Sequence, residues 1–241
     1  MNLEILPTRL AGAPENMAID FLLLQRYPNG GTPRFRHYGW HAPAFTFGYS
    51  QKIAFVRGEL SARADSSTPA FELCRRPTGG GIVDHREDWT YALVIPRGHA
   101  LEEVRASQSY REVHEALAAA LRIQGVEAVT KLAADPDAGE GGPAGVCFQQ
   151  AEIYDVVHPR SGAKIAGAAQ KRNKHGLLFQ GSIWRPAAGA VDWDKFEADF
   201  TAGLAAALGT TAEPVPWPEL NEDEVSGLTE QYSSPEWLAY R

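Results

Sequence analysis

Cys147 stands where a glycine-rich stretch gives way to a segment with the pattern of a strand, within GEGGPAGVCFQQAEIY. A thiol held between a surface loop and an ordered strand is in the position of a nucleophile, because its thiolate can attack a carbonyl carbon. The alternative is a small, partly buried side chain that only packs. Cys147 by itself is compatible with both interpretations.

Lys164 opens a run of small residues, KIAGAAQ, that has the length of a strand. Small side chains make a poor core, but they leave room beside the strand for a flat or elongated ligand. An ammonium group in this position could equally lie in solvent at the edge of a sheet. Taken alone, Lys164 favours that solvent-exposed alternative.

The third chemical string is RRPTGGGIVDH, residues 75–85, between two expected strands. Three consecutive glycines remove every side chain from the turn, so backbone N–H groups can approach a ligand and φ can be positive. Arg76 could add a permanently charged donor for a carbonyl, carboxylate or phosphate oxygen. The string is neither a Walker loop, which needs GK[ST], nor the dinucleotide fingerprint, which has another glycine spacing.

Composition places the 241-residue chain among globular proteins and argues against several classes of function. Its formal net charge of -7 disfavours broad nucleic-acid binding. Two cysteines, Cys74 and Cys147, are too few for a disulfide framework and lack the spacing of a metal site, so we expect free thiols and no metal. The sequence shows no secretory pattern and no apolar stretch of membrane-spanning length, which predicts a cytoplasmic protein without a membrane partner.

Basic residues gather in three short stretches that could form one positive surface if the fold brings them together. The alternative is a set of unrelated solvated faces. The stretches are RFRHYGWH, CRRP and QKRNKH, at residues 34–41, 74–77 and 170–175.

Hydrophobic periodicity predicts helices in three main places. The first is 14–27, with Pro14 in the first turn; the second runs from a capping box at Ser109 and Glu112 to about Ile123, closed by Gly125. The third follows Asp192 as its cap. Residues 133–146 are expected to be a surface loop, and 214–228 a proline-stiffened connection to a short terminal helix.

Strands are more numerous and are grouped, not alternated one by one with helices. Segments 34–40 and 44–51 are expected to pair across the short turn HAP. The other expected strands are 70–77, 89–96, 126–131, 152–157, 164–170 and 177–184, with tight turns at HPRSG and KRNKHG. This grouping favours an α+β fold with a large, mostly antiparallel or mixed sheet and helices packed against it. Cys74, in the apolar strand AFELC, is expected in the core.

The order of NMAIDFLLL, RFRHYGWHAPAFTFGYSQ, RRPTGGGIVDHREDWTYALVIP and KIAGAAQKRNKHGLLFQGSI resembles the lipoate-protein ligase A family, with its cysteine-dependent octanoyltransferase branch. The resemblance covers about residues 14–210. It implies a biotin/lipoyl-ligase type domain, related to class II synthetases, with an acyl chain between the glycine turn and the lysine strand. It also implies a single catalytic domain over 1–241, without the accessory domain that many ATP-using ligases add.

The resemblance implies a role for individual residues. Cys147, in the Cys-Phe pair typical of the transferase branch, would be the catalytic acyl acceptor, and Lys164 would lower its pKa. Where relatives carry Gln-His-Gly before Ser-Ile, this chain has Phe179, Gln180 and Gly181, so no histidine role carries over. The residues implied in acyl or substrate binding are Arg76, Gly79, Gly80, Gly81, Ile82, Val83, His85, Gly167 and Ala169. For His85, the other interpretation is that it only ties the turn to its neighbour.

The resulting hypothesis is an octanoyl-[acyl carrier protein]:protein N-octanoyltransferase that needs no cofactor. Its partners would be an acyl carrier protein as donor and a lipoyl-domain acceptor, such as the glycine cleavage H protein or a 2-oxoacid dehydrogenase E2. The enzyme would be a monomer with docking residues Lys171, Arg172 and Lys174. The alternatives are a lipoate ligase that uses ATP and Mg²⁺, an amidotransferase between lipoyl domains, and a non-catalytic lipoyl-binding module.

Overall fold

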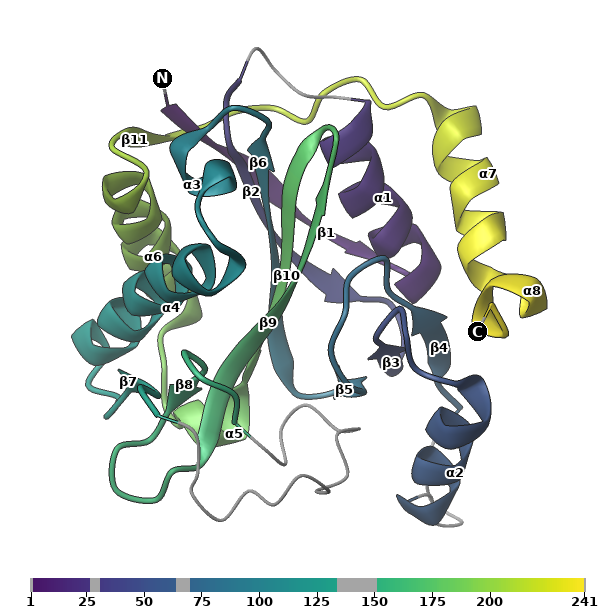
Figure 1. The fold of residues 1–241 in the computed structure, drawn as a ribbon, viewed down its shortest axis with the longest axis horizontal. Coiled ribbons are helices and arrows are strands. Elements are labelled where there is room, and N and C mark those ends of the chain that lie inside the picture. Colours follow the sequence, from purple (N-terminus) through teal and green to yellow (C-terminus); the bar gives the residue numbers. More distant parts are fainter. Residues whose placement is uncertain (1, 27–30, 64–69, 134–150, 241) are drawn as a thin grey trace.

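The computed structural model describes residues 2–26, 31–63, 70–133 and 151–240 (Figure 1). The helices are α1 (Ala13–Gln25), α2 (Ile53–Arg63), α3 (Ala100–Glu103), α4 (Ala106–Ile123), α5 (Arg185–Ala188), α6 (Trp193–Ala207), α7 (Glu222–Ser233) and α8 (Pro235–Leu238). The strands are β1 (Asn2–Ala11), β2 (Arg34–Trp40), β3 (Ala44–Phe47), β4 (Glu72–Arg75), β5 (Val83–Asp84), β6 (Asp88–Pro96), β7 (Val129–Thr130), β8 (Val156–Val157), β9 (Lys164–Asn173), β10 (Gly176–Trp184) and β11 (Thr211–Pro214).

The large sheet has eight strands in the order β11-β1-β2-β6-β10-β9-β8-β7, and β4, β3 and β5 form a second, smaller sheet. β1 runs parallel to both of its neighbours, while β2, β6, β10, β9, β8 and β7 follow one another antiparallel. The predicted α+β class with a mostly antiparallel, mixed sheet is therefore confirmed.

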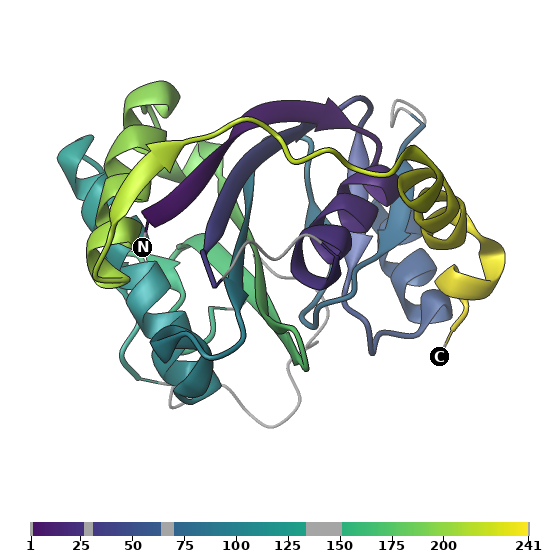
Figure 2. The same cartoon turned by 90° about the horizontal axis from the view of Figure 1, so that it is seen from above.

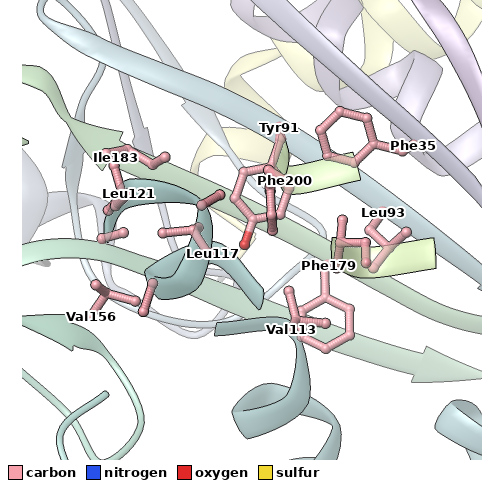
Figure 3. Close-up of a cluster of buried hydrophobic side chains, with 14 of the residues drawn as sticks. Phe35, Tyr91, Leu93, Val113, Leu117, Leu121, Val156, Phe179, Ile183 and Phe200 are labelled. Atoms are coloured by element: carbon pink, nitrogen blue, oxygen red, sulfur yellow. The ribbon is translucent and has the colours of Figure 1, made fainter. Parts of the chain in front are cut away.

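Helices cover both faces of the large sheet (Figures 1 and 2). α4 and α6 pack together on one face, and α1, backed by α7, lies on the other. Figure 3 shows the core under α4 and α6, where the aromatic rings of Phe35, Tyr91 and Phe200 meet leucines of α4. β6 is buried along its whole length because both of its faces are covered.

Several local predictions hold. Asp192 caps α6, its side chain accepting from the backbone N–H of Lys195, and Gly125 follows α4 with φ +82°. Cys74 is fully buried in the core, and burial raises the pKa of its thiol.

The predicted pairing of 34–40 with 44–51 is wrong. Both strands form, but β2 is paired on its two edges by β1 and β6, and β3 by β4 and β5, so neither has an edge left for the other. The amide of His41 donates to the Ala11 carbonyl, which turns the chain out of the large sheet at this point.

The predicted capping box is also wrong. The N-cap of α4 is Arg105, four residues before the predicted Ser109, so the helix begins at Ala106 and Ser109 lies inside its first turn. The Ser109 hydroxyl has one proton and lies 3.1 Å from both the Ala106 carbonyl and Gln170 Oε1 of β9, so it contacts both a helix and a strand. β1, α2 and β11 were not predicted, and β9 continues to Asn173, into the segment expected as a turn. At the tail, α7 begins at Glu222, inside the segment expected to be a connection.

Within the ranges that the structure describes, no helix has the length and apolar character needed to cross a bilayer.

Candidate functional site

A pocket lies against strands β9 and β10 and is also lined by residues on either side of the glycine turn at residues 78–81, namely Arg76 and Val83. Gly79, Gly80 and Gly81, predicted at the site, are not among the described residues that line it. It holds about 470 Å³ of empty space, including the space where it opens to solvent. Its lining residues are Met17, Tyr38, Thr46, Arg76, Val83, His85, Thr90, Lys164, Gly167, Ala168, Ala169, Gln180, Gly181 and Ser182. Six residues singled out from the sequence as site residues therefore meet around one pocket: Arg76, Val83, His85, Lys164, Gly167 and Ala169.

Strand register explains why small residues line one wall. Gln180 of β10 lies between Ala169 of β9 and Ala92 of β6, and Ser182 lies between Gly167 and Thr90. Alternate residues of a strand point to the same face, so Gly167 and Ala169 form a wall with little bulk. An elongated ligand can lie along such a wall.

The glycine turn is held by contacts between backbone groups. Gly80 has φ +87°, a conformation that favours glycine. Its carbonyl oxygen faces Gly48, at which a side-chain carbon would lie 1.9 Å away. The amide of Tyr49 also donates to the Thr78 carbonyl at 2.8 Å, so the segment after β3 fixes the turn from the outside.

Arg76 stabilises this turn by hydrogen bonds to its backbone carbonyls. Its guanidinium donates to the carbonyl oxygens of Gly79 and Gly81, each at 2.8 Å, and to the Thr46 hydroxyl at 2.8 Å. These contacts account for its burial, whereas the sequence predicted a donor for substrate oxygen. Ile82 was likewise predicted at the ligand, but it is buried in an apolar cluster beneath the turn, with Phe45, Phe47, Val56 and Leu60.

His85 is buried and both of its ring nitrogens contact protein groups. Nδ1 lies 2.6 Å from Asp88 Oδ2, and Nε2 lies 2.7 Å from the Thr46 hydroxyl. With Asp88 ionised, Nδ1 carries the proton and Nε2 accepts from Thr46, whose oxygen then accepts from Arg76. A hydrogen-bonded chain thus runs from Asp88 through His85 to the glycine turn, which corresponds to the tying role considered for this histidine.

Lys164 is 8% exposed, so it is not the solvated edge charge that its position alone suggested. Its Nζ lies 2.7 Å from Asp155 Oδ2, at the start of β8. A side-chain carbon at Gly167 would lie 2.6 Å from this Nζ. The glycine was predicted to make room for a ligand, and in the structure the lysine side chain occupies that space.

Sequence reasoning missed the polar residues that close the pocket on the α1 side. The Gln180 amide donates to Asp20 at 2.7 Å and its oxygen accepts from Thr78 at 2.7 Å, which links α1, β10 and the glycine turn. Asp20 is fully buried and pairs with Arg36 at 2.6 Å. The available signal was an aspartate within the apolar helix sequence MAIDFLLL, since a buried charge requires a partner.

The three basic stretches do not form one surface. Arg36 is buried against Asp20, Arg34 pairs with buried Glu4, and Arg75 donates to carbonyls of residues 49, 51, 237 and 238. Burial also lowers the pKa of His37. For the arginines of the first two stretches, both the shared positive surface and the solvated faces are wrong, while His41 is exposed.

The third stretch lies at the far end of β9. Lys171 stands 5.0 Å from the centre of the Tyr49 ring, and Lys174 is exposed in the turn before β10. Arg172 donates to the Glu102 carbonyl and, at 2.7 Å, to the Ser109 hydroxyl. Two of the three proposed docking residues therefore present their charge near the surface, and the third holds α4 to the sheet.

Cys147, the predicted nucleophile, lies at residues 134–150, outside the described residues.

The sequence model of the "Lipoyl protein ligase A/B catalytic domain" matches residues 13–186 of the chain. Among curated proteins, the chain is 30% identical over 280 residues to an "Octanoyltransferase LipM" of Symbiobacterium thermophilum, covering 98% of this chain and 97% of that protein. It is 33% identical over 172 residues to the octanoyltransferase LipM of Geobacillus kaustophilus, covering 70% of this chain and 60% of the relative.

Solved structures show the same fold. A lipoate-protein ligase A bound with ATP aligns with a TM-score of 0.70 at 18% identity, over 99% of this chain and 98% of that one. A bi-partite lipoate protein ligase from Thermoplasma acidophilum, described with its E2 lipoyl domain, aligns with a TM-score of 0.70 at 19% identity, over 99% and 96% of the two chains.

Proposed function

Because the chain belongs to the lipoyl protein ligase A/B catalytic domain family, we propose that it is an octanoyltransferase of lipoate biosynthesis. The observation that carries the proposal is a buried lysine at the wall of a narrow pocket lined by glycine and alanine, in a chain whose full-length relative is an octanoyltransferase. Residues 1–241 would act as a single catalytic domain in the cytoplasm.

The proposed reaction has two steps through Cys147. In the first, the Cys147 thiolate attacks the octanoyl thioester of an acyl carrier protein; a new thioester bond forms and the carrier thiol leaves. In the second, a lysine amine of a lipoyl domain attacks the acyl-enzyme, an amide forms, and the Cys147 thiolate leaves. The first step exchanges thioesters of similar energy and the second runs downhill, so the sequence requires no ATP.

Lys164 is the proposed source of positive charge for the thiolate. Lowering a thiol pKa from about 8.5 to about 7 requires roughly 2 kcal/mol. An ammonium at about 4 Å contributes about 4 kcal/mol of attraction at an effective dielectric near 20. The Asp155 carboxylate, 2.7 Å from Nζ, opposes part of this field, so Lys164 acts as one member of an ion pair and not as an isolated charge.

The glycine turn and the small-residue wall are the proposed binding surfaces for the acyl chain. Gly79, Gly81 and their neighbours would offer backbone N–H groups to the developing oxyanion. The surface charges of Lys171 and Lys174 would attract acidic carrier and lipoyl domains, which a chain with a net charge of -7 otherwise repels.

An ATP-dependent lipoate ligase is the second candidate, since a ligase of the same fold binds ATP. One experiment separates the two. The full chain is mixed with octanoyl carrier protein, without ATP, and its intact mass is measured. We expect one octanoyl adduct that is absent in Cys147→Ser and is transferred to an added lipoyl domain. An unchanged mass, together with lipoate-dependent pyrophosphate release when ATP is added, would select the ligase. An octanoyl-lipoyl domain used as donor tests the amidotransferase reading in the same assay.

A further inference from the structure

We propose that Asp155 and Tyr110 act as positioning residues that hold the Lys164 ammonium at the wall of the pocket. Asp155 is fully buried and lies 2.7 Å from Lys164 Nζ. Its other carboxylate oxygen accepts from the Tyr110 hydroxyl at 2.5 Å. The inference rests on the proposed function only for its catalytic consequence, because the contacts among Asp155, Tyr110 and Lys164 belong to the fold whatever the reaction is.

The orientation of Tyr110 follows from its hydrogen bonds. The hydroxyl accepts from the amide of Ala168 at 2.9 Å, so its single proton is left for Asp155. The amide of Glu152 donates to Asp155 Oδ2 at 2.7 Å. The carboxylate is therefore fixed by α4, by β9 and by the chain just before β8, and it determines where the ammonium can lie.

Gly167 completes the arrangement. The space where its side chain would be is filled by Cε and Nζ of Lys164. The lysine thus crosses the bare backbone of its own strand to reach Asp155. This route explains how a residue at the start of a strand presents its charge to a pocket lined further along that strand.

Three titratable groups near the pair, His114, Tyr110 and Tyr91, keep one charge state near neutral pH. On α4, burial lowers the pKa of His114 to about 4 and raises the pKa of Tyr110 well above its usual value. On β6, burial raises the pKa of Tyr91. Lys131, whose amide donates to the Asp155 carbonyl, directs its amine to the Ala151 carbonyl. Arg76 and His85 line the same pocket as Lys164.

A buried ammonium that loses its carboxylate holds its proton less tightly, because the remaining interactions do not repay its desolvation. Asp155→Asn is close in shape and removes the charge. Lys164 should then become a neutral, reactive amine at lower pH. Tyr110→Phe keeps both charges and removes two hydrogen bonds, the one to Asp155 and the one from the Ala168 amide, so its effect on the Lys164 pKa should be smaller.

The test measures the amine directly, without reliance on catalysis. Wild-type chain and variants are labelled with acetic anhydride from about pH 6 to 11, and the Lys164 peptide is quantified by mass spectrometry. In Asp155→Asn the midpoint of Lys164 labelling should fall by at least about one pH unit. Lys195 and Asp199 form a matched control, an ion pair of the same 2.7 Å length on the exposed face of α6. Asp199→Asn should barely move the labelling of Lys195.

If the curves of Lys164 labelling against pH coincide in wild type and Asp155→Asn, the proposal that Asp155 holds the Lys164 ammonium is wrong. If Asp155→Asn does not fold, the test is made with Tyr110→Phe. We expect Lys164 to be labelled several-fold faster in this variant than in wild type. An unchanged labelling rate would contradict the proposal. Octanoyl transfer is measured in parallel as a function of pH, where Asp155→Asn should lower the rate and move the basic limb to lower pH. A shifted labelling curve with an unaltered transfer profile would refute the positioning role. A wild type that takes up no octanoyl group would refute the proposed function and leave the labelling result to stand.

Discussion

A side-chain carbon at Gly48 would lie 1.9 Å from the carbonyl oxygen of Gly80, so the end of β3 and the glycine turn touch through bare backbone. The turn has little freedom to retreat, because Arg76 holds the carbonyls of Gly79 and Gly81. The conformation of the turn therefore depends on a residue outside the GGG string.

Gly48→Ala should damage both the fold and the site, because the colliding atom belongs to the backbone. We expect the melting temperature to drop by several degrees, equivalent to about 2 kcal/mol or more, and octanoyl transfer to fall at least about tenfold. Gly79→Ala is the control, since no atom lies within 4 Å of its would-be side chain. Equal melting temperatures for the two variants would contradict the predicted collision.

Gly167→Ala should act on the lysine and much less on stability. The new methyl group would lie 2.6 Å from Lys164 Nζ, the end of a side chain that can be displaced. If the reaction passes through the proposed acyl-enzyme, a displacement of about 1 Å should lower the rate of its formation about 10- to 100-fold, measured by rapid-quench mass spectrometry. Gly203→Ala, whose methyl would meet Ala116 at 3.6 Å, should retain the wild-type rate. An unaltered rate for Gly167→Ala would show that Lys164 need not occupy this place.

Asp88→Asn should destabilise the chain that supports the turn. One oxygen of Asp88, Oδ2, accepts from His85, Thr90 and Ser182. Asparagine can present its amide oxygen to these donors, but it removes the negative charge and buries an amide NH2 in place of Oδ1, which has no partner among the described residues. The free energy of unfolding should fall by about 2–4 kcal/mol, measured by urea titration. The exposed Asp84, paired with Arg86, supplies the comparison variant Asp84→Asn, which should change stability by less than about 1 kcal/mol.

The lowered pKa of His114 predicts that the free energy of unfolding depends on pH. Burial lowers its pKa to about 4 in the folded chain, whereas the unfolded chain takes up this proton near pH 6.5. The unfolded state therefore binds more protons between these values, and stability falls by about 3 kcal/mol as the pH drops from 7 to 4. His114→Gln should lack this part of the slope, while the exposed His41→Gln should keep it. Parallel stability curves for wild type and His114→Gln would count against the shifted pKa.

Local signals in the sequence sufficed where the structure depends on near neighbours. Asp192 caps its helix through a contact three residues away, and Gly125 ends α4 by a conformation that other residues rarely adopt. The strand KIAGAAQ and the glycine turn were located by composition, and Arg76 and Val83, on either side of that turn, line one pocket with Lys164.

The wrong predictions share one cause: the structure of these segments depends on contacts with residues that are distant in sequence. Whether β3 pairs with β2 depends on β4 and β5, which arrive later in the chain. Arg36 and Arg75 look like surface charge until Asp20 and the carbonyls of residues 237 and 238 are in place. Nothing within EIYDVV marks Asp155 as a site residue, because its ion-pair partner, Lys164, lies on the other side of the β8–β9 connection.

The parallel pairing of β1 with both β2 and β11 has a consequence for how the molecule is made. β1 is synthesised first among the described strands, yet its outer neighbour begins at Thr211. A contact of such sequence separation forms late and slows folding. During translation, one edge of β1 thus stays unpaired until β11 has been synthesised. An unpaired strand edge can pair with other chains, which favours aggregation or chaperone binding.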